Sequence, residues 1–156
     1  GEKLYRRSMY TYWKRSSPMP NMLIFDAPTR EKCMIQRPVT NTPLQALVTL
    51  NDPQFVEAAR AFSQRLIKAG GNDTASRIDY GFRLALARPP TLEERKIIVG
   101  VLGEQLTRFR NDQQKAKQFL SVGQMARDES LDIAEHAAWT VVAQLLLNMD
   151  ETLTRG

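Results

Sequence analysis

The chain has 156 residues, of which 42% are hydrophobic and 25% charged, a composition typical of one globular domain rather than of a disordered segment. It contains one cysteine, Cys33, and one histidine, His136, which excludes an internal disulfide, a structural zinc site and a Cys-ligated iron–sulfur site. The Cys-x-x-Cys-His motif of c-type haem attachment is missing as well, so we predict neither a cofactor nor a metal in this chain.

The net charge of +5 lies entirely in the first forty residues. Residues 1–40 contain eight basic and three acidic side chains, whereas residues 41–156 contain fourteen of each sign. The first segment also carries Tyr5, Tyr10, Tyr12 and Trp13 within nine positions. We therefore divide the chain into a basic, aromatic arm (residues 1–40, called the arm below) and a neutral domain (residues 41–156).

Neither a secretory signal nor a membrane span is predicted. Residues 1–16 are too charged for the apolar core of a signal, and no apolar run reaches the roughly 18–20 residues that a membrane helix needs. The chain begins at Gly1 without an initiator Met, so we expect it to be a piece of a longer polypeptide.

The arm gives mixed signals for local structure. Apolar residues at helical spacing favour a helix over residues 3–15, but the Tyr-Thr-Tyr-Trp run also suits a strand, and we favour the helix. Pro18 and Pro20 should end it, because the residue before a proline is pushed out of the helical region. Residues 16–40 are predicted to form a long ordered loop, and loops of this length are usually functional or docked on a partner.

The rest of the chain is predicted to be helical, over residues 43–50, 53–69, 75–87, 91–110, 112–120 and 131–148. Thr42-Pro43 and Asp52-Pro53 are helix-start signals, and Thr91 with Glu94 forms a capping box. The last helix is apolar on most of its circumference, which is typical of a central helix. No hairpin signal occurs, so we predict an all-α fold: an irregular orthogonal bundle of five to six helices with an extended N-terminal arm.

Several longer strings are specific enough to indicate a family. They are RRSMYTYWKR (6–15), FDAP (25–28), TNTPLQAL (40–47), LNDPQFV (50–56), AWT (138–140) and LNMDE (147–151). Together they resemble a planctomycete-type C-terminal domain of unknown function, found in large predicted exported proteins and often accompanied upstream by a cytochrome-c-like module. The resemblance implies a periplasmic, envelope or otherwise exported location and partners among the upstream domains of the same polypeptide, but it implies no particular chemistry.

Polar residues gather around the predicted start of the first bundle helix. Free N–H groups at a helix start beside an arginine suit a carboxylate, phosphate or sulfate. The candidate ligand-binding residues are Asp26, Arg37, Asn41, Thr42, Gln45 and Asp52. The alternative is that these side chains cap two helices and fix the preceding loop.

The arm admits three interpretations, because arginines beside aromatic rings can bind nucleic acid, another protein surface or the chain's own bundle. The neutral remainder and the implied exported context argue against nucleic acid. We therefore predict an interface with an upstream domain or with the bundle itself. The candidate interface residues are Tyr5, Arg6, Arg7, Tyr10, Tyr12, Trp13, Lys14 and Arg15.

Two further residues invite a chemical role. Asp132 lies four residues before His136 and could raise its pKa, as a general base requires, but no nucleophile motif accompanies the pair, and a half-buried structural histidine is the simpler interpretation. Cys33 is predicted to be a small buried residue, and Asp26 to form a charge cluster with Arg30 and Glu31 that fixes the loop.

The sequence thus favours an interaction or scaffolding module, with no catalytic residues assigned. The alternative is part of an enzyme site that binds an anionic or carbohydrate substrate near residues 37–52.

Overall fold

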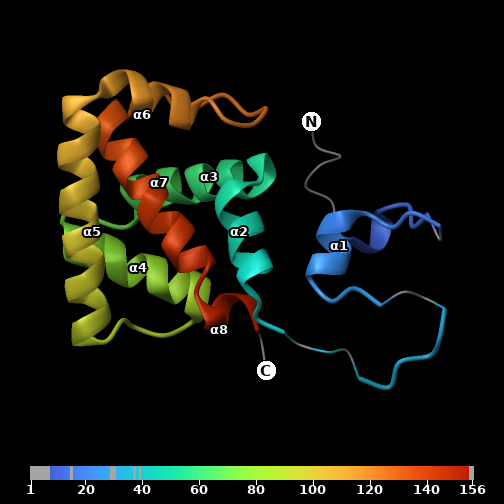
Figure 1. Cartoon of the computed structure of the whole chain (residues 1–156). Helices are drawn as coiled ribbons and strands as arrows, with labels where there is room; N and C mark the ends of the chain where they lie inside the picture. Colours follow the sequence, from blue (N-terminus) through green and yellow to red (C-terminus); the bar gives the residue numbers. More distant parts are fainter. Residues whose placement is uncertain (1–7, 15, 29–30, 37, 39, 155–156) are drawn as a thin grey trace.

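The structure is a computed structural model that describes residues 8–14, 16–28, 31–36, 38 and 40–154. In this part of the chain all regular structure is helical and no strand forms, which confirms the all-α prediction. The elements are the 3-10 turn η2 (Ser8–Tyr10) and the helices α1 (Pro20–Ile24), α2 (Pro43–Asn51), α3 (Pro53–Ala69), α4 (Thr74–Leu86), α5 (Leu92–Asn111), α6 (Gln113–Leu120), α7 (Ile133–Leu147) and α8 (Asp150–Leu153) (Figure 1). The six predicted helices correspond to α2–α7, each within two residues of its predicted bounds.

Side-chain caps fix where the bundle helices begin. The backbone N–H groups in the first turn of a helix have no partner within that helix. Just before each of these helices, a carboxylate or hydroxyl oxygen accepts a hydrogen bond from one of those N–H groups. The caps of α2 to α7 are Thr42, Asp52, Asp73, Thr91, Asp112 and Asp132. The capping boxes of α2 and α5 add a reciprocal bond from the backbone N–H of the cap residue to Gln45 or Glu94.

Helix α7 is the centre of the bundle. Ten of its fifteen residues are buried, as its apolar circumference predicts. It packs against α3, α5 and α6, which surround it (Figure 1). Trp139 of α7 lies in one core cluster with Leu66, Phe82, Leu102 and Leu120, one residue from each of the neighbouring helices α3 to α6. Such burial supplies the main stabilisation of the fold, at about 1.5–3 kcal/mol per large apolar side chain.

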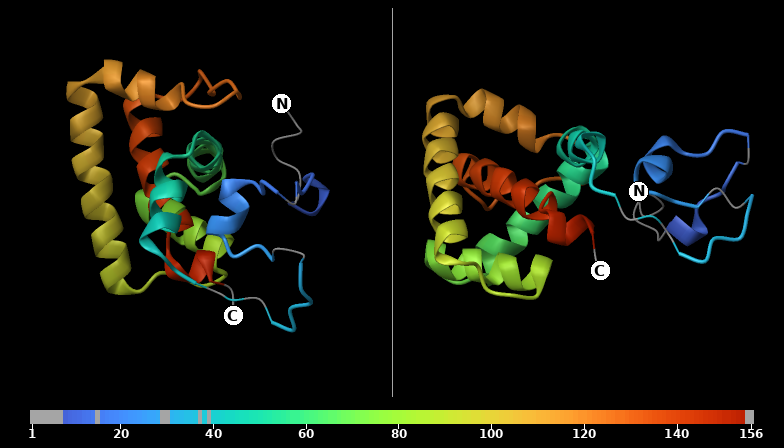
Figure 2. Two further views of the ribbon diagram at one scale, coloured as in Figure 1. Left: turned by 45° about the vertical axis from the view of Figure 1, so that its right-hand side comes forward. Right: turned by 60° about the horizontal axis from the view of Figure 1, so that its bottom comes forward.

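The described part of the arm lies beside the bundle, next to α2 (Figure 2). The predicted helix over residues 3–15 is wrong for its described second half: only Ser8–Tyr10 forms a 3-10 turn, and residues 11–14 are not helical. Residues 3–7 and 15 lie outside the described residues. Aromatic and β-branched side chains lose rotamer freedom in a helix, which explains why residues 11–14 do not continue it.

Two other expectations for the arm need correction. Helix α1 lies within the predicted loop and begins at Pro20, whose fixed φ suits the first position of a helix. Cys33 is exposed rather than buried. It belongs to a segment, residues 31–36, in which every residue is exposed to solvent.

Candidate functional site

The polar segment around the start of α2 forms a hydrogen-bond network with the arm. Asp26, in a left-handed conformation with φ +56°, accepts bonds from the backbone N–H and the hydroxyl of Thr40, at 3.0 and 2.7 Å. Asp26 thereby joins the end of the α1 turn to the chain that enters α2. The predicted cluster with Arg30 cannot be described, since Arg30 lies outside the described residues.

Gln45 is the buried centre of this network, with 2% of its surface exposed. Its Oε1 accepts from the backbone N–H of Thr42 at 2.9 Å, and the Thr42 hydroxyl accepts from the backbone N–H of Gln45 at 3.3 Å. Its Nε2 donates to the carbonyl oxygen of Ile24 at 2.8 Å and to the Thr40 hydroxyl at 3.2 Å. The amide of Gln45 therefore caps α2 and holds α1 at the same time.

The other predicted residues of this segment point to different neighbours. Asp52 caps α3 through the backbone N–H of Gln54 and accepts a second bond from Nδ2 of Asn21 at 3.1 Å. Nδ2 of Asn41 donates to the carboxylate of Asp150 in α8 at 2.6 Å. The structure thus brings Asp26, Thr42 and Gln45 together, places Asp52 and Asn41 at separate contacts, and leaves Arg37 outside the described residues. These contacts fix α1, α2 and α8, and ligand binding by this segment stays a prediction.

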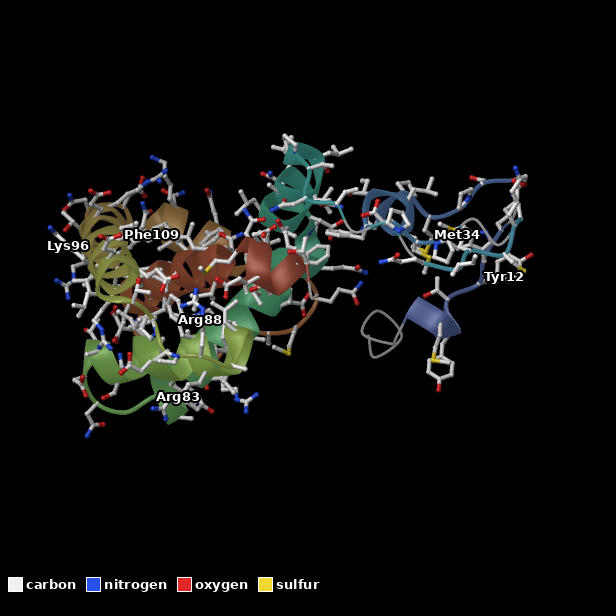
Figure 3. The ribbon with its side chains drawn as sticks, turned by 90° about the horizontal axis from the view of Figure 1, so that it is seen from below. Tyr12, Met34, Arg83, Arg88, Lys96 and Phe109 are labelled. Carbon is white, nitrogen blue, oxygen red and sulfur yellow. The ribbon has the colours of Figure 1, made fainter. Side chains whose placement is uncertain are left out.

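The predicted interface residues of the arm are partly described. Tyr10 and Tyr12 are 70% and 83% exposed, and Tyr12 lies far from the bundle (Figure 3). Trp13 is half-buried and Lys14 is exposed. Tyr5, Arg6, Arg7 and Arg15 lie outside the described residues.

A buried polar cluster between α3 and the segment after α6 was not predicted from the sequence. The carboxylate of Glu57, which is 3% exposed, accepts hydrogen bonds from the backbone N–H groups of Gln124 and Met125 at 2.7 and 2.8 Å. The guanidinium of Arg60, which is 2% exposed, donates to the carbonyl oxygens of Leu120 and Met125. Both side chains therefore fix residues 120–125 on α3, and the Glu57–Arg60 ion pair at 4.0 Å offsets part of the cost of burying two charges.

His136 lies at the inner end of this cluster and is completely buried, rather than half-buried as predicted. Its Nε2 lies 3.5 Å from the carbonyl oxygen of Arg60, while its buried Nδ1 has no hydrogen-bond partner among the residues that the structure describes. Burial, more than any nearby charge, lowers the pKa of His136, so the expected increase by Asp132 is wrong. Asp132 is instead engaged as the cap of α7, accepting from the backbone N–H of Glu135 at 2.8 Å.

The hydroxyls near His136 are engaged in bonds between and within helices. The hydroxyls of Ser63 in α3 and Thr140 in α7 lie 3.0 Å apart, and each also lies within hydrogen-bond distance of a carbonyl of its own helix. One hydroxyl donates across to the other, and this bond joins the two central helices. A weak signal existed in the sequence: Glu57, Arg60 and Ser63 recur every three residues alongside the apolar stripe of α3.

Among the described residues, no group of three or more His, Cys, Asp or Glu side chains is placed to hold a metal ion. In that same part of the chain, no helix has both the length and the apolar character needed to cross a membrane.

Comparison with curated proteins and with solved structures found no significant match. A family model does match: PSD1, described as a protein of unknown function (DUF1553), covers residues 1–102. The match includes the whole arm, the network around Gln45 and the buried residues of α3, and it extends over well more than half of the chain. The chain therefore belongs to the DUF1553 family.

Proposed function

We propose that this chain is an interaction module whose arm and α2 dock on another domain of the polypeptide that carries it. The supporting observation is where large apolar side chains are exposed. Ten of the fifteen such side chains found among the described residues lie between residues 9 and 50. They are Met9, Tyr10, Tyr12, Met19, Leu23, Met34, Ile35, Leu44, Leu47 and Leu50. Exposed apolar residues gathered in this way mark an interaction surface.

The described part of the arm contacts the bundle through the network around Gln45, through the Asn21–Asp52 bond, and through the rings of Phe25 and Phe55, whose centroids lie 5.6 Å apart. This leaves Tyr10 and Tyr12 free of the core cluster. Aromatic side chains contribute strongly to binding when a partner buries them.

The positive charge of the arm indicates the charge of the partner surface. Residues 1–40 carry the whole net charge of +5, so an acidic surface suits them best. An exported or envelope location, a C-terminal position and association with a cytochrome-c-like module belong to the same proposal, and they rest on the resemblance of the sequence strings.

Hydrogen–deuterium exchange tests the proposal. We expect the amides of residues 8–28 to exchange at least about tenfold more slowly in the natural polypeptide than in this chain alone, because docking restricts opening. Replacing Tyr10 and Tyr12 by Ser should remove that protection. The control Leu92→Ser changes a side chain that is 86% exposed on the bundle and should leave it intact. Equal exchange of these amides in both proteins would contradict the proposal.

A further inference from the structure

A hollow of about 440 Å³ lies between α3, the end of α6 and the segment that follows α6. The residues that line it include three basic ones, Arg60, Lys117 and Arg127, one acid, Glu129, and the partly exposed apolar residue Met125. The size is that of a site for a small molecule. The lining combines charged groups with an apolar wall.

The wall of the hollow is firmly held. Glu57 accepts from two consecutive backbone N–H groups of this wall, and Arg60 donates to a carbonyl at each end of residues 120–125. Gly123, with φ +97°, gives the turn that presents those N–H groups to Glu57. The hollow is therefore formed before any ligand arrives, which reduces the entropic cost of binding.

The charges around the hollow leave a positive excess. Glu57 balances Arg60, and Glu129 alone faces Lys117 and Arg127. No ion pair joins Lys117 or Arg127 to another described residue. Burial lowers the pKa of His136 most; the contact with the Arg60 carbonyl raises this pKa, the charges of Arg127 and Arg60 lower it, and the charge of Asp128 raises it. An anion in the hollow would relieve the repulsion among the basic side chains.

We propose that this hollow binds a small molecule carrying a carboxylate or phosphate group. Lys117 and Arg127 bind the anionic group, and Met125, whose side chain is 45% exposed, contacts the apolar part of the ligand. The site is separate from the arm and does not depend on the docking proposed above.

The test is a titration followed through the amide NMR signals of residues 124–127, with inorganic phosphate and with benzoate at constant ionic strength set by chloride. We expect saturable shifts with a dissociation constant of about 1 mM or below for at least one of the two probes. The probe that saturates identifies the anionic group. Lys117→Gln and Arg127→Gln should each weaken binding at least about tenfold.

The matched control is Lys115→Gln, which removes the same charge from α6 at a side chain that is 67% exposed and paired with Asp112. Binding should be unchanged in this variant. Circular dichroism checks that each variant folds. Lys117 is exposed, so its replacement should leave the fold intact, and weaker binding by that variant would reflect the lost charge. The proposal would be overturned if the shifts saturated with neither probe. It would also be overturned if the Lys115 and Lys117 variants lost binding affinity equally.

Discussion

Gly123 is a residue whose backbone and surroundings both exclude a side chain. Its φ of +97° is a conformation that residues with a Cβ rarely adopt. A Cβ at this position would overlap the carboxylate of Glu57, which holds the adjacent N–H groups. The turn and the buried carboxylate therefore depend on each other.

Gly123→Ala should destabilise the protein by roughly 1–3 kcal/mol, because the backbone is strained and Glu57 must move. Gly103→Ala is the matched control, since a Cβ at Gly103 in α5 meets nothing within 4 Å. It should stabilise the helix by about 0.5–1 kcal/mol. Urea unfolding of both variants measures the two effects, and equal changes of the same sign would refute this explanation.

His136 should make stability depend on pH. Its folded-state pKa is below the ordinary value of 6.5, so the unfolded chain binds the proton more readily. The contribution to stability is complete above pH 6.5 and is lost progressively as the pH falls below it. The slope is at most about 1.4 kcal/mol per pH unit.

Because the chain has one histidine, His136→Gln and His136→Asn should flatten the stability profile between pH 7 and 5, whatever their effect on overall stability. Chemical unfolding at several pH values measures the profile. An unchanged slope in both variants would show that this histidine is not the titrating group.

At the scale of the elements, the end of α4 carries an unfavourable residue. Ala87 follows the helix in the left-handed conformation, with φ +57°, and is exposed. Glycine is usual at this position because it has no Cβ. The helix is stopped there by Pro89 and Pro90 rather than by a favourable cap, as the sequence predicts.

Ala87→Gly should therefore stabilise the protein by about 0.5–1 kcal/mol, despite the greater freedom of glycine in the unfolded chain. Ala85→Gly, two residues earlier and inside α4, should destabilise it by at least about 0.5–1 kcal/mol. Thermal unfolding distinguishes the two, and destabilisation by both would contradict the role assigned to the left-handed position.

At the scale of the whole molecule, one arginine joins three helices. Arg88 donates to Glu94 at the start of α5 at 2.6 and 2.9 Å, and to Glu151 of α8 at 2.8 Å. Its guanidinium also lies 5.6 Å from the ring centroid of Phe82 in α4. The bonds from Arg88, followed by the capping bond with Thr91, lower the pKa of Glu94 to about 2.

This carboxylate contributes stability that is complete above its ordinary pKa of 4.5 and is lost as the pH falls toward 2. Arg88→Gln should raise the pKa of Glu94 and make the loss of stability between pH 4.5 and 2 shallower. Carboxyl-carbon NMR titration measures the pKa. Arg83→Gln, which removes an exposed charge from α4 five residues before Arg88, is the control and should leave the pKa of Glu94 unchanged. An unchanged pKa in the Arg88 variant would contradict this assignment.

The region that the family model matches is shorter than the helical bundle that folds as one unit. The match ends at residue 102, inside α5, whereas α7 at residues 133–147 is the most buried helix. Helices α3, α5 and α6 each present an apolar face to α7. The first 102 residues therefore cannot bury their own core, and α6 and α7 belong to the same folding unit.

The sequence by itself determined the helices of the bundle, their caps and the central position of α7. These follow from local chemistry: a hydroxyl or carboxylate that satisfies free N–H groups, a proline with fixed φ, and apolar spacing along a helix. Thr42 and Asp52 were predicted as possible caps for this reason, and the structure confirms both.

Only the tertiary structure decided what the buried polar side chains of α3 and α7 do. Glu57 and Arg60 resemble ordinary surface residues in the sequence, and they are buried because a segment sixty or more residues away supplies their partners. Likewise the pKa of His136 is lowered, and not raised by Asp132, because helices from distant parts of the chain remove the imidazole from water. Long-range pairing depends on which elements meet in space, and local sequence patterns do not identify the partner of a buried polar side chain.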